Sequence, residues 1–153
     1  MVQSPMMPMP KALRDAHGER LERLLQPQVA LTLVYNDIVS LDRCRRDLKK
    51  LRNVIDRKLL GSKYYKRQPH ERSQFWGVVE ALDVFTHIHI GWQMPEPHGI
   101  DHFRKILESV WVDFSGKGWY DARDYYGSKW ASYACEELPD ASFIIESADF
   151  LRS

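Results

Sequence analysis

Long apolar runs, cysteines and glycine-rich loops are all scarce in this chain of 153 residues. No stretch approaches the ~20 apolar residues of a membrane-spanning helix, which argues against a membrane protein. The two cysteines are too few for a disulfide framework and lack metal-site spacing, so we expect a reducing, cytoplasmic compartment. The opening MVQSPMMPMP has no secretion signal, and the lack of a GK[ST] motif excludes a P-loop ATPase.

The remaining composition is that of one soluble globular domain. Hydrophobic residues make up 44% of the chain and charged residues 28%, and the aromatic residues (five Trp, seven Tyr and six Phe) predict a substantial core. Residues 1–10 contain three prolines and four methionines, which predicts a disordered tail. Residues 11–153 are then expected to form a single domain.

Acidic residues are also nearly missing from one segment. Between Arg43 and Arg67 there are eleven lysines and arginines against two aspartates, so this segment carries a charge of +9 although the whole chain carries only +1. A dense basic element in a near-neutral protein indicates a polyanion partner. The alternative is an ordinary solvated helix face, although such a face usually mixes both signs.

Hydrophobic periodicity predicts an α+β domain in which helices pack on a mainly antiparallel sheet. The order is helix, strand, helix, hairpin, helix, strand, helix and strand. We expect helices at Lys11–Leu25 (interrupted at Gly18), Ser40–Leu60 (ended by Gly61), Ile100–Val112 and Ser128–Leu138, and strands at Val29–Tyr35, Phe75–Leu82, Thr86–Trp92, Trp119–Tyr126 and Ser142–Glu146.

The stretch HIHIGW carries the strongest chemical signal. Alternate residues of a strand share a face, so His87 and His89 point the same way and can converge on one divalent ion. In a hairpin Glu80 lies opposite His87, or opposite His89 after a slip of two residues, and it shares their face in either register, whereas an odd-numbered loop or a bulge would move it to the other face. One carboxylate and two imidazoles form a site suited to Mg²⁺ or Mn²⁺. The alternative is a polar, solvated strand face.

A second signal lies in the segment KWASY. Lys129 and Tyr133 are separated by four residues and are therefore neighbours on one face of a helix. A phenol ordinarily has a pKa near 10, but a nearby ammonium group or metal ion favours the phenolate as a nucleophile. Alone, a tyrosine in this position more often serves packing. Tyr125 and Tyr126 are alternative nucleophiles, and His98 and His102 form a weaker candidate metal pair.

Together these residues resemble the HUH endonucleases, and among them the rolling-circle replication initiators of plasmids and phages. VALTLVY is similar to the first motif strand of that family, HIHIGW to its metal motif and WASYACEEL to its tyrosine-bearing helix. The resemblance spans about residues 29–145. It implies a five-stranded antiparallel sheet flanked by helices and a Mg²⁺ or Mn²⁺ site at His87 and His89 with Glu80 as third ligand.

The resemblance also implies an activity. Tyr133, helped by Lys129, would attack a phosphodiester of single-stranded DNA at an origin or hairpin and leave a 5′-phosphotyrosine link and a free 3′-hydroxyl. No helicase domain follows, so unwinding would need a host helicase. The residues expected to hold the DNA are Arg43, Arg46, Lys49, Lys50, Lys63, Lys66 and Arg67, with Tyr64 and Tyr65 stacking on bases.

One residue departs from the family pattern. Family members often have a lysine three residues after the tyrosine, where this chain has Glu136. An acid beside a scissile phosphate is unfavourable, so a second hypothesis is a DNA-binding or origin-recognition protein that does not nick. A third is a transposase-like enzyme that acts as a dimer, although the sequence has no evident swapped-helix arrangement.

Overall fold

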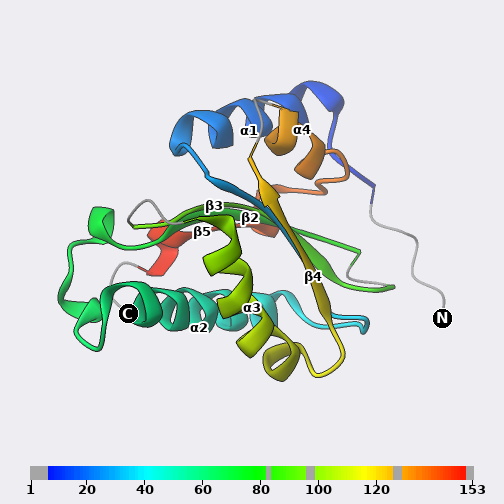
Figure 1. The fold of residues 1–153 in the computed structure, drawn as a ribbon. Coiled ribbons are helices and arrows are strands. Elements are labelled where there is room, and N and C mark those ends of the chain that lie inside the picture. The colour runs from blue at the N-terminus through cyan, green and yellow to red at the C-terminus, as the bar shows by residue number, and fades with distance from the viewer. Residues whose placement is uncertain (1–6, 82–83, 96–98, 126–128, 151–153) are drawn as a thin grey trace.

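The computed structural model describes residues 7–81, 84–95, 99–125 and 129–150. They form an α+β fold around a five-stranded antiparallel sheet with strand order β4-β1-β3-β2-β5 (Figure 1), which confirms the predicted fold class. The strands are β1 (Val29–Val34), β2 (Gln74–Glu80), β3 (His87–Gln93), β4 (Trp119–Asp124) and β5 (Ile144–Glu146), and the helices are α1 (Lys11–Leu24), α2 (Leu41–Leu60), α3 (Ile100–Ser115) and α4 (Lys129–Ala134).

The helices cover the two faces of the sheet in pairs (Figure 1). Helices α2 and α3 cover one face, and α1 and α4 lie over the other. In β3, Ile88 and Ile90 face α2, since a side chain at Gly77 between them would touch Leu48 of α2. His87 and His89 alternate with them and therefore point to the face covered by α4. No helix of the described residues is long and apolar enough to cross a membrane.

Helix α2 follows its sequence pattern closely. The Ser40 side chain accepts a hydrogen bond from the backbone N–H of Arg43 and so caps the first turn, while Gly61 ends the helix with a positive φ of 91°. Cys44, Leu48 and Leu51 are fully buried against the sheet. Both predicted ends of this helix are confirmed.

Helix α1 differs from the expectation because it runs through Gly18 without interruption. Gly18 is buried against α4, and a Cβ atom there would lie 3.0 Å from the Cα atom of Ser132. Glycine therefore permits close helix packing here and does not break the helix. Residues 1–6 of the expected tail lie outside the described residues, while Met9 donates a backbone hydrogen bond to the Leu138 carbonyl.

Several elements begin or end a few residues from the predicted positions. Strand β4 ends at Asp124, and its predicted last residue, Tyr126, lies outside the described residues. Helix α4 ends at Ala134 and strand β5 begins only at Ile144, because tight turns replace the expected end of the helix and the expected start of the strand. One such turn is the 3-10 helix before β5, where the Asp140 side chain accepts a hydrogen bond from the backbone N–H of Ser142. Helix α3 runs three residues beyond its predicted end, to Ser115.

Candidate metal centre and adjoining groove

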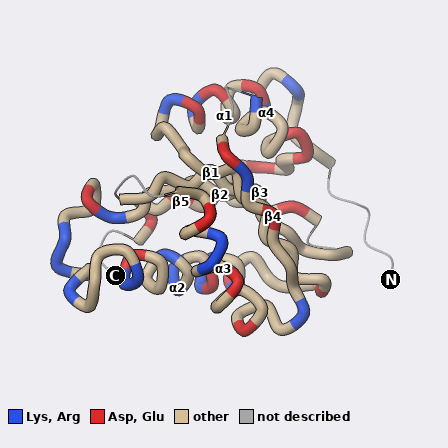
Figure 2. Tube along the Cα trace, viewed as in Figure 1, with Lys and Arg blue, Asp and Glu red and all other residues tan. Residues whose placement is uncertain are grey.

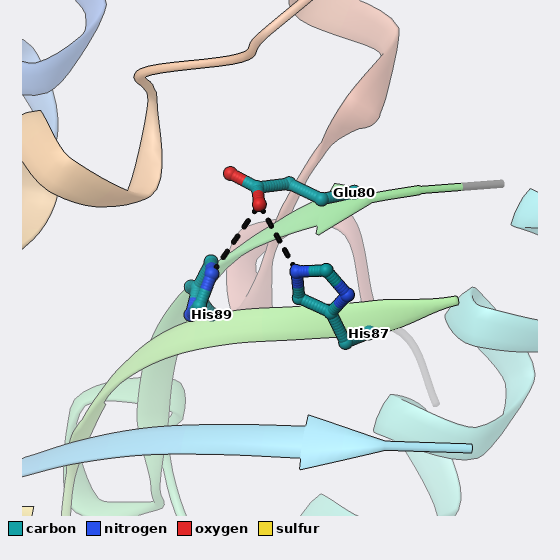
Figure 3. Close-up of side chains that lie close together, drawn as sticks. All are labelled: Glu80, His87 and His89. Atoms are coloured by element: carbon teal, nitrogen blue, oxygen red, sulfur yellow. Dashed lines mark hydrogen bonds and ion pairs between the residues drawn. The ribbon is translucent and has the colours of Figure 1, made fainter. Parts of the chain in front are cut away.

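The hairpin of β2 and β3 brings Glu80, His87 and His89 together (Figure 3). Glu80 pairs directly with His87, which is the first of the two registers that the sequence leaves open. The Oε2 atom of Glu80 lies 3.0 Å from Nε2 of His87 and 3.4 Å from Nε2 of His89. One ligand atom from each residue lies within 4.8 Å of the others, so these three side chains could hold a metal ion.

The second nitrogen of each imidazole is held by another group. His87 Nδ1 lies 3.1 Å from the Phe85 carbonyl oxygen, and His89 Nδ1 lies 3.2 Å from the hydroxyl oxygen of Thr32 on β1. Because a carbonyl can only accept, Nδ1 of His87 donates to it, so Nε2 is the atom that would be available to a metal ion once the ring is neutral. The rings are thus oriented before any ion arrives.

Charge also favours a cation in this cluster. The hydrogen bond with Glu80 outweighs burial and raises the pKa of His87 above its ordinary value. Burial disfavours ionisation of Glu80, but the hydrogen bonds and charges of His87 and His89 hold its pKa below the ordinary value. Glu136 and Glu137 line the same hollow, of about 520 Å³, together with the cluster. Three carboxylates around two imidazoles attract a divalent ion and repel a bare phosphate.

Tyr133 lies beside this cluster. Its ring centroid is 5.3 Å from that of His89, and its side chain is half exposed. On the same helix, Trp130 stacks on Tyr133 with centroids 5.4 Å apart and donates an indole hydrogen bond of 3.1 Å to the Ile90 carbonyl. That bond ties α4 to β3. The helix of the candidate nucleophile and the strand of the candidate metal ligands therefore form one unit.

Helix α1 holds α4 from the other side. A carboxylate oxygen of Glu22 accepts hydrogen bonds from the backbone N–H of Ala131, at 3.2 Å, and from the hydroxyl of Tyr125. Arg14 donates to the Glu136 carbonyl, just after the end of α4. These contacts, with the close packing at Gly18, fix the position of a helix that is only six residues long.

A groove of about 840 Å³ leads away from the cluster over strands β1 and β4. Its floor is formed by the short side chains of Ala30 and Thr32 on β1. One wall comes from α4 and includes the predicted Lys129 and Tyr133, and the other comes from β4 and includes Trp119. The groove and the hollow at the cluster share Thr32, His89, Trp119 and Tyr133, so the two are continuous.

The basic segment lies elsewhere. Figure 2 shows lysines and arginines along α2, which covers the face of the sheet opposite the cluster. Tyr64 lies 5.2 Å from the guanidinium group of Arg72, near the start of β2. The Glu80–His87–His89 group, called the metal cluster below for its candidate role, lies at the end of β2, about 20 Å further along the strand. The predicted DNA-binding residues and the predicted metal site are therefore not brought together.

The lysines and arginines of the basic segment differ in whether their side chains are available to bind a polyanion. Arg43 donates a hydrogen bond of 3.0 Å to the Phe114 carbonyl and forms an ion pair with Asp47, so it serves the fold. Arg52 is buried and bonded to the Ser73 carbonyl. We call the remaining exposed basic residues of the segment the basic ridge: Arg46, Lys49, Lys50, Arg57, Lys58, Lys63, Lys66 and Arg67.

The weaker candidates gain no role from the geometry. Tyr125 is bonded to Glu22, and burial together with that carboxylate raises the pKa of its phenol further above the ordinary value. Tyr126 and His98 lie outside the described residues. His102 is exposed on α3, on the other side of the sheet from the cluster.

Four residues at the site escaped the sequence reasoning: Thr32, Trp119, Trp130 and Glu22. Thr32 had a usable signal, because a hydroxyl inside the apolar run VALTLVY sits beside the histidines if that strand pairs with HIHIGW. The other three depend on how β4, α4 and α1 pack, which no local pattern reveals.

No protein-family model, curated protein sequence or solved structure matches this chain. The functional argument therefore depends on the geometry of the cluster and the groove.

Proposed function

We propose that the protein is a metal-dependent endonuclease that nicks single-stranded DNA through a 5′-phosphotyrosine intermediate, as in initiation of rolling-circle replication or mobilisation. The observation that carries the proposal is the position of Tyr133. Its phenol ring lies against His89, a member of the Glu80–His87–His89 cluster, in an open hollow. A nucleophile beside a cation site is what phosphoryl transfer to a side chain requires.

The reaction exchanges one phosphodiester bond for another. The Tyr133 oxygen attacks the phosphorus atom, the new O–P bond forms, and the bond to the 3′ oxygen breaks. The phenol proton goes to solvent and the leaving 3′ oxygen takes up a proton, so a free 3′-hydroxyl results. The reverse attack, by a 3′-hydroxyl on the phosphotyrosine, rejoins the strand without an external energy source.

The chain's own residues would have distinct roles in this step. Glu80, His87 and His89 would hold a Mg²⁺ or Mn²⁺ ion, which supplies polarisation of a phosphate oxygen and neutralises developing charge. Lys129, on the groove wall one turn before Tyr133, would lower the cost of forming a phenolate. The basic ridge would hold the DNA backbone electrostatically, and a host helicase would supply unwinding.

The test is covalent capture of single-stranded DNA labelled at its 5′ or 3′ end. We expect an adduct that survives denaturing electrophoresis, forms only with Mn²⁺ or Mg²⁺ and carries the label of the 3′ fragment. Tyr133→Phe and the His87→Ala/His89→Ala pair should abolish it. Tyr65→Phe is the matched control, because that tyrosine is also more than half exposed but lies in the turn after α2. Equal cutting by the parent and Tyr133→Phe would refute the mechanism.

Glu136 favours a second candidate function. Its position in the hollow with Tyr133 and the cluster places an acid where a scissile phosphate would bind. A DNA-binding or origin-recognition protein without nicking activity would tolerate that acid. Salt-dependent binding with no adduct under any divalent ion would support this alternative, and recovery of an adduct in Glu136→Lys would identify the acid as the cause.

A further inference from the structure

Half-exposed aromatic rings gather around the metal cluster. Among the described residues, four aromatic side chains are more than half exposed: Tyr65, Phe85, Trp119 and Tyr133. Three of them, all except Tyr65, line the hollow that contains Glu80, His87 and His89. Large apolar rings left in water at one place mark a binding surface.

Trp119 has the most favourable position of these rings. It lines both the hollow at the cluster and the groove over β1 and β4, and it stands on β4, the terminal strand of the sheet. Trp130 and Tyr133 line the groove from α4. Because Ala30 and Thr32 leave the floor low, flat ligands can enter between the two walls.

The chemistry of the groove indicates unpaired nucleotides. Flat aromatic walls offer stacking surfaces for nucleobases, and Arg123 and Lys129 supply cations for a backbone beside the carboxylates of Asp121 and Asp124. The Asp121 carboxylate is 2.8 Å from the Arg123 guanidinium, which offsets part of its repulsion of a phosphate. Paired bases hide their faces within the duplex, so a double helix cannot use these walls. A volume of about 840 Å³ is in the range of well-formed ligand sites.

We infer that Trp119 stacks on an unpaired base next to the phosphate bound at the metal cluster, and that the groove behind it holds the adjoining single strand. This inference rests on the proposed function in one respect, that the ligand is a nucleic acid strand. It assigns the position of the strand, over β1 and β4, and a residue that selects single-stranded over double-stranded substrate. It does not require that Tyr133 cuts.

The test measures binding in a protein that cannot form the tyrosine adduct. In a Tyr133→Phe background with Mn²⁺, fluorescence anisotropy gives the affinity for a short labelled oligothymidylate. Trp119→Ala should weaken binding roughly 5- to 100-fold, the worth of one stacked base, and Trp119→Phe should retain most of it. Val112→Ala is the control and should bind this short oligonucleotide like the parent, because Val112 is an equally half-exposed apolar side chain on α3, over the other face of the sheet.

A second measurement separates stacking from a structural effect. An abasic nucleotide is placed in turn at each position of the oligonucleotide. At one position the missing base should weaken binding to the parent yet have no further effect on Trp119→Ala. The fold should persist in that variant, since the Trp119 side chain is half exposed and its backbone carbonyl still accepts the 2.9 Å hydrogen bond from the Trp111 indole.

The outcomes distinguish this inference from the proposed function. If the parent forms no adduct under any condition but Trp119→Ala still weakens oligonucleotide binding, nicking is overturned and the base site stands. A normal adduct with unchanged binding by Trp119→Ala would overturn the base site alone. The base site would also be overturned if Trp119→Ala weakened the binding of a blunt duplex as much as that of the single strand. It would be overturned as well if Val112→Ala weakened single-strand binding and Trp119→Ala did not.

Discussion

Glu22 is expected to control the position of Tyr133 although it lies on a different helix. Its carboxylate accepts hydrogen bonds from the Ala131 backbone N–H, at 3.2 Å, and from the Tyr125 hydroxyl. Glu22→Ala removes both bonds and leaves two partly buried donors without their acceptor. Hydrogen bonds to a charged group contribute about 1.5–3 kcal/mol each, and we expect a combined loss of about 2–4 kcal/mol because these bonds are only partly buried.

Urea unfolding measures the loss of free energy, and thermal unfolding gives a second measurement of it. The expected loss corresponds to a fall in Tm of about 4–16 °C for a chain of this size. Glu22→Gln keeps an acceptor oxygen and should lose only about 1 kcal/mol. Glu19→Ala is the matched control, since Glu19 is an exposed glutamate of the same helix. A double-mutant cycle with Tyr125→Phe isolates the Glu22–Tyr125 bond from the remaining effects.

Two further readouts test the link to the candidate nucleophile. Mn²⁺ affinity should be unchanged in Glu22→Ala, because the metal cluster stands on β2 and β3, whereas adduct formation through Tyr133 should fall because α4 is less firmly held. The reasoning is refuted if Glu22→Ala unfolds at the same urea concentration as the parent, or if the cycle with Tyr125 shows no coupling.

Three other predictions follow from single sites. Mn²⁺ affinity should rise between about pH 6 and pH 8, because His87 must release its proton to bind metal and the pKa of this proton is raised. A constant affinity in calorimetry across this range would contradict the prediction. Burial raises the pKa of Cys44 to about 12 and of Cys135 to about 11, so neither thiol should react with iodoacetamide at pH 8 unless the protein unfolds, as mass spectrometry can check. Gly118→Ala should destabilise the fold by about 3 kcal/mol in urea unfolding. Its Cβ would lie 2.1 Å from a carbonyl oxygen of β1, while Gly99→Ala, which meets no atom within 4 Å, should cost only about 0.5 kcal/mol, because alanine is a poorer N-cap for α3.

The metal cluster was largely predictable from the sequence because its geometry is local. Alternation along one strand places His87 and His89 on one face, and a short hairpin then restricts where Glu80 can lie. Helix α2 was predictable for a similar reason, since Ser40 and Gly61 are capping residues of the ordinary kind at its two ends. In both cases the determining contacts lie within a few residues of one another or across a single turn.

The rest of the site depends on contacts between segments distant in sequence. In the sequence Gly18 resembles a helix breaker, but in the structure it allows Ser132 of α4 to pack closely against α1. The basic ridge was expected to bind the same DNA as the metal cluster, but charge density says nothing about which face of the sheet a helix will cover. Trp119 gives no signal of its own, because its partners across the groove come from α4.

If the protein binds a DNA strand as proposed, the opposite placement of the basic ridge and the metal cluster would make its affinity depend on the length of the strand. A strand seated at β3 must pass two further strands, about 10 Å, and then round the sheet edge past a helix layer before it reaches the ridge, a path of about 30 Å in all. Oligonucleotides shorter than this path would occupy the groove alone, and their affinity would depend only weakly on salt concentration. Longer oligonucleotides would bind more tightly because they also reach the basic ridge, and only this additional affinity would disappear in concentrated salt.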